Sequence, residues 1–270
     1  MKKNYKRVLT IAGSDPSGGA GIQADLKTFS ACGCFGTSAI VAVVDENTVS
    51  VTGVHPVPVD FVIGQIKSVL DDIGADAVKI GMLHSSELIR AVKETLAIYD
   101  IKNIVLDPVM VATSGDKLLQ DDAIETLKRE LIPFAFVITP NIPEAEVLLG
   151  RKIGGQSDLP LVIRELSVGG KVSVLLKAGH LKEELLTDVF YNAETDEIIE
   201  LTSKRIHTKN THGTGCTFSS AIAAFLAHGI PLCDAVLRAK EYMKSAITAG
   251  SAYEIGKGHG PVHHFFDFWE

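Results

Sequence analysis

The sequence is poor in cysteine and tryptophan, and it has no long apolar segment. Its 270 residues include 4 cysteines and 1 tryptophan. The cysteines are Cys32, Cys34, Cys216 and Cys233. They are too few for a disulfide framework, and none belongs to a Cys-x-x-Cys pair of the kind that binds zinc. The sequence therefore excludes a small disulfide-rich fold.

The N-terminus lacks the features of a targeting segment. Its apolar run over 8–12 ends at Gly13, whereas a secretory signal needs about seven to fifteen apolar residues and a membrane helix about twenty. We therefore expect a cytoplasmic protein with no membrane partner.

Positive charge is also scarce. The chain has 26 Lys and Arg residues against 33 Asp and Glu residues, which gives a formal net charge of -7. Nucleic-acid binding needs a basic field, and no Lys/Arg-rich run follows the first few residues. We therefore expect no nucleic-acid partner.

The bulk composition is that of a globular protein. Hydrophobic residues make up 46% of the chain and charged residues 22%, which argues against disorder. The length allows one large buried core, and no internal repeat or low-complexity linker divides the chain. A single domain spanning 1–270 is the simplest organisation.

Short apolar runs alternate with helical patterns along most of the chain. The predicted parallel strands cover 7–12, 38–44, 76–80, 103–106, 136–139 and 172–177. Most of these runs are continuously apolar and rich in Val and Ile, as is typical of strands covered on both faces. Helical patterns lie between them, for example at 61–70 and 88–98. The alternation predicts an α/β fold with a mostly parallel central sheet and helices on both faces.

The last third of the chain departs from this alternation. Two apolar stretches at 189–191 and 198–201, separated by a polar turn, predict an antiparallel hairpin. Two long helices are predicted after it, at 216–228 and 232–250.

This layout predicts where a ligand binds. In open parallel sheets the ligand lies beyond the carboxyl ends of the strands. The residues at those ends are Gly13, Ser14, Asp15, Gly81, Met82, Asp107, Pro108, Val109, Thr139, Pro140, Asn141, Lys177, Ala178 and Gly179. Glycine, polar and charged residues therefore gather along one edge of the sheet, which is the expected active site.

The first glycine-rich segment, 14–25, loosely matches a dinucleotide-binding fingerprint at Gly19, Gly21 and Ala24. Fingerprint glycines turn the chain directly after the strand, but 14–18 separate Gly13 from Gly19. An oxidoreductase is therefore disfavoured. A tightly packed helix start would explain Gly21, but not the adjacent pair of Gly18 and Gly19.

The second glycine-rich segment, 210–224, places Gly213 and Gly215 before an alanine-rich helix. Free backbone N–H groups and the helix dipole make such a start an anion site. An ordinary helix cap is the alternative, but a cap needs one Ser or Thr rather than two glycines flanking Thr214. The segment also lacks the Gly-x4-Gly-Lys-Ser/Thr pattern of a Walker loop.

Two acidic residues follow neighbouring predicted strands. Carboxylates such as Asp107 and Glu144 at adjacent strand ends suit hydrated Mg²⁺. In the alternative interpretation, Asp107 begins a turn and Glu144 favours the first turn of a helix. Spacing alone leaves both interpretations open.

The motifs taken together resemble the ribokinase-like kinases, and most closely the hydroxymethylpyrimidine/phosphomethylpyrimidine kinases of thiamine biosynthesis. The resemblance rests on AGSDPSGGAGIQADLKTF near the start, KIGML at 79–83, LDPVM at 106–110, TPNIPEAE at 139–146, KNTHGTGCT at 209–217 and GKGHGPVHHF at 256–265. It covers essentially the whole chain. It implies a ribokinase-like fold, and it implies that one site phosphorylates a hydroxymethyl group and then the resulting monophosphate, with ATP and Mg²⁺.

The resemblance also implies roles for individual residues. The anion hole and catalytic centre would comprise Gly213, Thr214, Gly215 and Cys216. Substrate-binding positions would be Gly13, Asp25, Glu46, Met82 and Val109, and nucleotide-binding positions Asn141, Lys177, Lys209 and Thr211. Asp107 and Glu144 would organise the metal. A homodimer is also expected.

Two positions depart from common patterns. Most ribokinase-like enzymes carry Asp as the base where Cys216 stands, whereas the pyrimidine kinases resemble this chain in having Cys. A thiolate is expected there, because a helix N-terminus lowers the pKa of a cysteine. Glu46 stands where the family commonly has Gln, at a position that contacts the ring.

The substitution at Glu46 leaves the identity of the ring open. A pyridoxal or pyridoxine kinase is the alternative function, because relatives on this scaffold handle both rings. A non-catalytic vitamer-binding protein is disfavoured by the presence of Asp107, Glu144 and the intact GTGC loop at 213–216.

Overall fold

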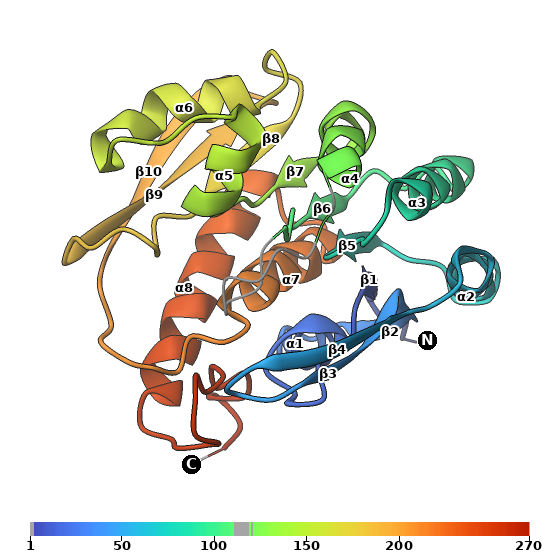
Figure 1. Ribbon diagram of the computed structural model, residues 1–270, viewed down its shortest axis with the longest axis horizontal. Coiled ribbons are helices and arrows are strands. Elements are labelled where there is room, and N and C mark those ends of the chain that lie inside the picture. Colours follow the sequence, from blue (N-terminus) through green and yellow to red (C-terminus); the bar gives the residue numbers. More distant parts are fainter. Residues whose placement is uncertain (1–2, 111–118, 120, 270) are drawn as a thin grey trace.

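The core of the fold is an eight-stranded sheet, seen in a computed structural model that describes residues 3–110, 119 and 121–269 (Figure 1). The strand order is β10-β9-β8-β7-β6-β5-β1-β2. The strands that run parallel are β1 (Arg7–Ala12), β2 (Phe35–Ile40), β5 (Ala77–Ile80), β6 (Ile104–Leu106), β7 (Val137–Ile138) and β8 (Ser173–Leu176). The antiparallel hairpin of β9 (Leu185–Asn192) and β10 (Glu197–Lys204) extends the sheet beyond β8.

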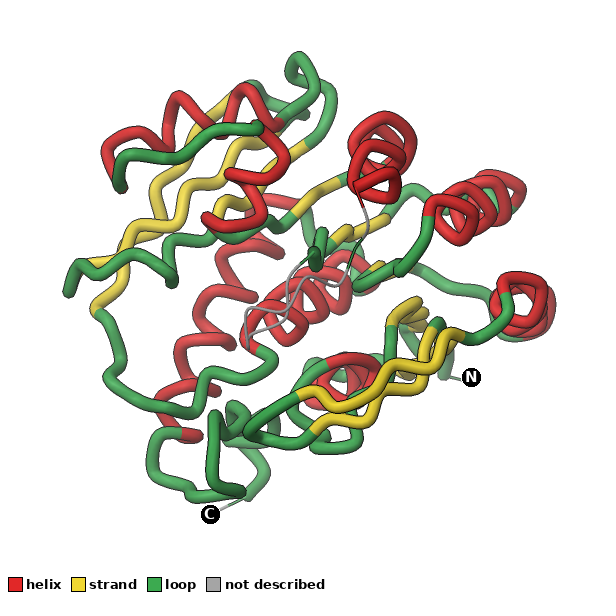
Figure 2. Tube along the Cα trace, viewed as in Figure 1, coloured by secondary structure: helices red, strands yellow, loops and turns green. Residues whose placement is uncertain are grey.

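Helices cover both faces of this sheet (Figure 2). One face carries α1 (Gly21–Ala31), α7 (Thr214–Ala227) and α8 (Leu232–Gly250). The other carries α2 (Val59–Asp72), α3 (Ser86–Ile98), α4 (Asp121–Thr126), α5 (Ile142–Leu149) and α6 (Leu159–Leu166), with the short turns η1 (Leu127–Leu131), η2 (Ile132–Phe134) and η3 (Gln156–Asp158). The predicted α/β fold, the parallel sheet and the late hairpin are confirmed.

The apolar strands supply both halves of the core because successive side chains point to opposite faces. In β1, Leu9 and Ile11 pack against the α2–α6 side, whereas Val8 packs against the α1, α7 and α8 side. All three are completely buried. This explains why the strands read as continuous apolar runs rather than as alternating patterns.

The prediction of one strand over 38–44 is wrong, because the chain bends at Val41. β2 ends at Ile40, and β3 (Ala42–Glu46) leaves the main sheet to pair antiparallel with β4 (Val51–Pro56). We call β3, β4 and the turn between them the flap. At the bend, Val41 N donates to Ala12 O at 3.0 Å. Because apolar residues stand on both sides of Val41, hydrophobicity alone did not reveal the bend.

The order of the crossovers creates a crevice at β1. The helix after β1 lies on one face, whereas the helices before and after β5 lie on the other. Such a reversal opens a crevice at the carboxyl edge of the sheet, where α/β proteins bind ligands.

Among the described helices, none has the length and apolar character needed to cross a membrane.

Candidate active site

A cavity of about 740 Å³ lies at the carboxyl edge of the parallel strands. Most of the predicted site residues line it: Gly13, Glu46, Met82, Asp107, Val109, Asn141, Glu144, Lys177, Thr211, Gly213, Thr214, Gly215 and Cys216. Their elements are far apart in sequence and meet at the sheet edge. Lys209 does not line the cavity, and its side chain is exposed.

Asp25 also does not line the cavity, contrary to the expectation from the resemblance. It is completely buried behind the cavity wall, where its carboxylate accepts hydrogen bonds from Thr10 Oγ1 at 2.6 Å and Ser220 Oγ at 2.7 Å. Lys79 Nζ lies 2.9 Å from both carboxylate oxygens. Lys79 itself lines the cavity. Sequence reasoning missed this lysine, although a charge inside the apolar strand β5 was a signal.

The two glycine-rich segments pack directly against each other. Gly213 has a φ of 74°, and a Cβ there would overlap the carbonyl of Gly19. A Cβ on Gly19 would in turn overlap the ring of His212. Only glycine fits these close approaches, which accounts for Gly19, and the φ of 78° at Gly18 favours glycine there. The first segment thus supports the loop that begins α7.

The start of α7 lines the same cavity as the charged residues Asp107 and Lys177. Thr214 is the first residue of α7, and Gly215 is the second. A Cβ on Gly215 would lie 3.3 Å from both Asp107 Oδ2 and Lys177 Nζ. The loop therefore lies against this ion pair. Unpaired N–H groups at a helix start, beside a buried lysine, form a site for phosphate oxygens.

Cys216 lies in the first turn of α7 and receives a hydrogen bond from the backbone N–H of Gly21, the first residue of α1. Burial raises the pKa of its thiol to about 11, because the lowering effects of Lys79 and of the Gly21 N–H do not offset it. The predicted thiolate is therefore wrong for the free protein. Helix position favours the thiolate, but loss of hydration outweighs it.

Asp107 and Lys177 form a buried ion pair. Lys177 Nζ lies 2.9 Å from Asp107 Oδ1, which also accepts from Thr139 Oγ1 at 2.9 Å. Burial raises the pKa of Asp107, but Lys177 and Lys79 outweigh it and hold that pKa below its usual range. Asp107 is therefore ionised, and it remains beside the loop that begins α7.

Glu144 lies in the first turn of α5, as one of the two interpretations of the sequence predicted. Its side chain accepts from Asn141 N at 2.8 Å, and Asn141 Oδ1 accepts from Glu144 N at 2.9 Å, so the two residues form a capping box on α5. Burial, opposed by Lys177 and reinforced by Asp107, raises the pKa of Glu144 to about 8. A divalent cation bound here would relieve this repulsion between carboxylates. The donor set therefore fits Mg²⁺, which prefers carboxylates and water.

A second polar cluster stands at the flap end of the cavity. His212 Nε2 lies 2.8 Å from Asp15 Oδ2 and 3.9 Å from Glu46 Oε1. Burial raises the pKa of Asp15, but hydrogen bonds from His212, Ser17 and the Ala20 N–H hold it well below its usual range. Burial, and then Asp15, raise the pKa of Glu46, and His212 opposes them. Asp15 was expected at the sheet edge, but its pairing with His212 could not be predicted, because 197 positions separate the two residues.

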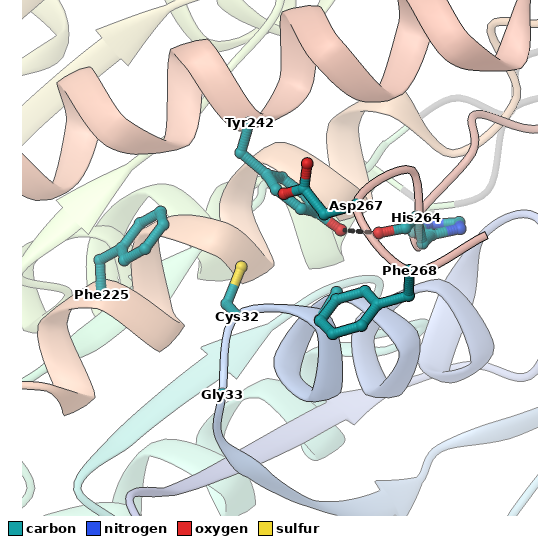
Figure 3. A pocket seen from close by; sticks show the side chains of 8 residues that line it. Cys32, Gly33, Phe225, Tyr242, His264, Asp267 and Phe268 are labelled. Atoms are coloured by element: carbon teal, nitrogen blue, oxygen red, sulfur yellow. Dashed lines mark hydrogen bonds between the residues drawn. The ribbon is translucent and has the colours of Figure 1, made fainter. Parts of the chain in front are cut away.

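A smaller cavity of about 380 Å³ lies elsewhere, between the end of α1, helices α7 and α8, and the C-terminal tail (Figure 3). Phe225, Phe268 and Cys32 line it, and Tyr242 Oη donates to the carbonyl of His264 at 2.7 Å. Burial raises the pKa of the Cys32 thiol to about 12. None of the predicted site residues lines this cavity, so the larger one is the candidate active site.

The comparisons with known proteins agree with this geometry. The protein-family model for phosphomethylpyrimidine kinase matches residues 15–263. A hydroxymethylpyrimidine/phosphomethylpyrimidine kinase of Rhizobium meliloti (strain 1021) is 49% identical over 263 residues, which cover 97% of this chain and 98% of the relative.

Two solved structures are similar to the fold. A pyridoxal kinase of Bacillus subtilis in complex with ADP has a TM-score of 0.87 at 38% identity, over 97% of this chain and 98% of its own. A phosphomethylpyrimidine kinase of Clostridium difficile 630 has a TM-score of 0.78 at 44% identity, over 89% of this chain and 99% of its own.

Proposed function

The chain belongs to the phosphomethylpyrimidine kinase family, and we propose which of its residues bind the substrates and which take part in phosphoryl transfer. It is a hydroxymethylpyrimidine/phosphomethylpyrimidine kinase of thiamine biosynthesis. It transfers a phosphoryl group from ATP to 4-amino-5-hydroxymethyl-2-methylpyrimidine and then to the monophosphate. One observation supports the proposal most strongly. The loop at 213–216, the Asp107–Lys177 ion pair and the flap residue Glu46 all line one cavity.

The loop at 213–216 is proposed to hold the transferring phosphoryl group. Phosphoryl transfer depends mostly on positioning and on stabilising charge over the phosphoryl oxygens. Backbone N–H groups of Gly213, Thr214, Gly215 and Cys216 would supply that stabilisation without reorganising. Lys177, close to the loop, would neutralise the ATP phosphates, with Asn141 and Thr211 beside them.

Cys216 is proposed to take the proton of the hydroxymethyl group. Its neighbours Lys79 and the Gly21 N–H favour the charged form, although burial keeps most of the thiol protonated at rest. The small thiolate population would be a strong base because its pKa is high. Gly13, Met82 and Val109 would form the walls against the ring.

Asp107 and Glu144 are proposed to hold Mg²⁺, which would neutralise charge on the phosphates. The relief of repulsion between the two buried carboxylates supports this assignment. Asp107 also keeps Lys177 in place through the 2.9 Å ion pair.

A coupled ATP-consumption assay tests the function. We expect turnover of hydroxymethylpyrimidine and of its monophosphate, and we expect the monophosphate to compete with the first substrate because one cavity serves both. Turnover of both compounds without mutual competition would contradict the single site. Pyridoxal belongs in the same assay, because a pyridoxal kinase shares the fold at a TM-score of 0.87. Preference for pyridoxal would establish the alternative function.

Glu46 is expected to make ring binding depend on pH. An aminopyrimidine needs a partner that accepts from its amino group and donates to its ring nitrogen; of the two forms of Glu46, only the protonated carboxyl does both. Burial and Asp15 raise the pKa of Glu46, with His212 opposing, so it keeps its proton to higher pH than an ordinary Glu. As pH rises through that pKa, the proton is lost and the ring should bind about tenfold more weakly.

Glu46→Gln should remove most of this dependence, because an amide donates at every pH. The measurement is the Kd for hydroxymethylpyrimidine by calorimetry between mildly acidic and alkaline pH, in both proteins. Parallel profiles in the two proteins would mean that Glu46 does not contact the ring.

A homodimer is proposed through the flap side of the molecule. Val43 is 53% exposed and Val54 is 44% exposed on the flap, and Phe35 is 45% exposed on the edge strand β2. Apolar side chains along unpaired strand edges favour a protein partner. Light scattering should then give twice the monomer mass of 28.9 kDa. We also propose a cytoplasmic location, since the reaction consumes ATP.

A further inference from the structure

A short C-terminal segment joins the flap to the loop that precedes α7 (Figure 1). We call residues 256–261 the strap. On the flap side, the backbone N–H groups of Lys257 and Gly258 both donate to Thr48 Oγ1 at 3.2 Å. The N–H of His259 donates to the carbonyl of Thr48 at 2.8 Å. Thr48 lies in the turn of the flap, and it therefore receives three hydrogen bonds from the strap.

The opposite side of the strap contacts the loop at 209–212. The carbonyl of Gly260 accepts from the N–H of His212 at 3.0 Å, and His259 Nδ1 lies 3.2 Å from the carbonyl of Lys209. His212 and Pro261 form an isolated parallel bridge. The strap thus lies between two parts of the candidate active site that are not joined to each other in sequence.

The alternating glycines of the strap follow from this packing. A Cβ on Gly258 would overlap the carbonyl of Thr48, and one on Gly256 would overlap the Thr48 side chain. A Cβ on Gly260 would overlap the amide oxygen of Asn210, whose Nδ2 donates to the carbonyls of Gly250 and Tyr253 at 2.7 Å. The glycines of the motif at 256–261 therefore allow the strap to pack closely against Thr48 and Asn210. None of them has a proposed role in phosphoryl transfer.

The flap needs such an attachment. A two-stranded hairpin is marginally stable alone in water, and β4 is largely exposed within one protomer. The base of the flap is tied to β1 by Ser14 N, which donates to Ala42 O at 2.9 Å, and by Val44 N, which donates to Ser14 Oγ at 3.1 Å. The strap supplies the second attachment, at the opposite end.

Glu46 lies between these two attachments. It is two residues before Thr48, and its carboxylate faces His212 across 3.9 Å at the flap end of the cavity. His212 is held by the same strap through Gly260. Loss of the Thr48 contacts would therefore free the flap side of the ring-binding end, whereas Lys177 and Asp107 at the phosphate end are held by their own ion pair.

We propose that Thr48 and the strap are positioning residues for ring recognition: they fix the flap so that Glu46 faces the pyrimidine beside His212. This inference rests on the proposed function, because it takes Glu46 as a contact of the ring. It assigns no chemical step to the strap, which acts only through the geometry of the flap.

The experiment compares four variants. Thr48→Val removes the acceptor of two hydrogen bonds, and Thr48→Ser keeps it. Gly258→Ala introduces the overlap with the Thr48 carbonyl. Gly64→Ala is the matched control, because a Cβ on this glycine of α2 would have nothing within 4 Å. The readouts are KM for hydroxymethylpyrimidine, KM for ATP, kcat, and hydrogen exchange of the flap amides at 42–56 in the free protein.

We expect Thr48→Val and Gly258→Ala to raise KM for the pyrimidine about tenfold and to speed exchange in the flap, with KM for ATP within about twofold of wild type. Thr48→Ser and Gly64→Ala should resemble wild type. Unchanged flap exchange in both disruptive variants would overturn the proposal. An equal rise in both KM values would also overturn it, because it would indicate general loosening.

The exchange measurement separates this inference from the proposed function. It requires no substrate, so the attachment of the flap is tested even if wild-type protein does not phosphorylate hydroxymethylpyrimidine. Failure of wild-type turnover would contradict the function, whereas normal turnover with a flap indifferent to Thr48→Val would contradict the inference alone.

Discussion

Cys216→Ala is expected to lower kcat by about 10²–10⁴-fold, the usual contribution of a general base, while ATP binding persists. The two effects separate because the backbone N–H groups that receive the phosphates do not depend on the Cys216 side chain. The variant should remain folded, since the change removes one sulfur atom from a partly exposed position at the start of α7.

The pH dependence of kcat gives the same hypothesis a second test. With a pKa of about 11, the thiolate fraction is small at neutral pH and rises about tenfold for each pH unit below that value. At saturating substrates, kcat should therefore rise with pH in wild type and lose this dependence in Cys216→Ala. This trend is opposite in sign to the expected effect of pH on ring binding through Glu46.

Cys233→Ala is the matched control for Cys216. Cys233 is also partly exposed and near the start of a helix, α8, but it does not line the cavity. Its removal should leave kcat within about twofold of wild type. If Cys216→Ala behaved like this control, the thiol would only line the pocket, and another group would have to accept the proton.

Asp107→Asn is expected to damage both catalysis and folding. Loss of one electrostatic group that acts on the transferring phosphoryl typically costs about 10²–10³-fold in kcat. The Mg²⁺ concentration needed for half-maximal rate should also rise, since one of the two proposed carboxylate ligands is lost. Initial rates measured across a Mg²⁺ titration give both quantities.

The effect on folding follows from burial. Lys177 is 12% exposed and Asp107 is 2% exposed in their side chains, so the amide would leave a buried ammonium with a weaker partner. Breaking a buried pair in this way costs about 3–5 kcal/mol in the free energy of unfolding, and Glu144 nearby should keep the loss at the lower end. Denaturant unfolding without Mg²⁺ measures it.

Asp76→Asn provides the comparison. Asp76 pairs with Arg7 at 2.8 Å, but these side chains are 29% and 38% exposed. Partly exposed pairs contribute less than buried ones, and the amide in Asp76→Asn would keep an oxygen for the Arg7 N–H that Asp76 accepts at 2.8 Å, so this variant should lose much less stability than Asp107→Asn and keep its Mg²⁺ dependence. Equal losses of stability in the two variants would mean that burial does not distinguish the Asp107 pair, and an unchanged Mg²⁺ requirement in Asp107→Asn would remove it from the metal site.

The sheet edge could be predicted from the sequence because its signals are local. Each parallel strand is a short apolar run, and the residue after it is glycine, acidic or amide, as at Gly13, Asp107 and Asn141. The rule that ligands bind beyond the carboxyl ends then brings these positions together without any knowledge of side-chain contacts. The two predicted helices at the end of the chain were local patterns of the same kind.

Features that depend on contacts between distant residues could not be predicted in this way. Asp25 and Lys79 are 54 positions apart, and no local pattern reveals that their pairing takes Asp25 out of the cavity wall. The thiol of Cys216 shows the same limit. Its position at a helix start is visible in the sequence, but the burial that raises its pKa, and its neighbours Lys79 and Gly21, arise only in the folded chain.

The face of the sheet covered by α1, α7 and α8 has a consequence for synthesis of the chain on the ribosome. Strands β5 to β8 are complete by residue 176, but the helices α7 and α8 that cover Ala77, Val105 and Val137 end only at residue 250. During translation, an apolar sheet face therefore remains uncovered until the last quarter of the chain has been synthesised. Nascent chains with such a face are prone to aggregation, so this protein should rely on chaperones until translation is nearly complete.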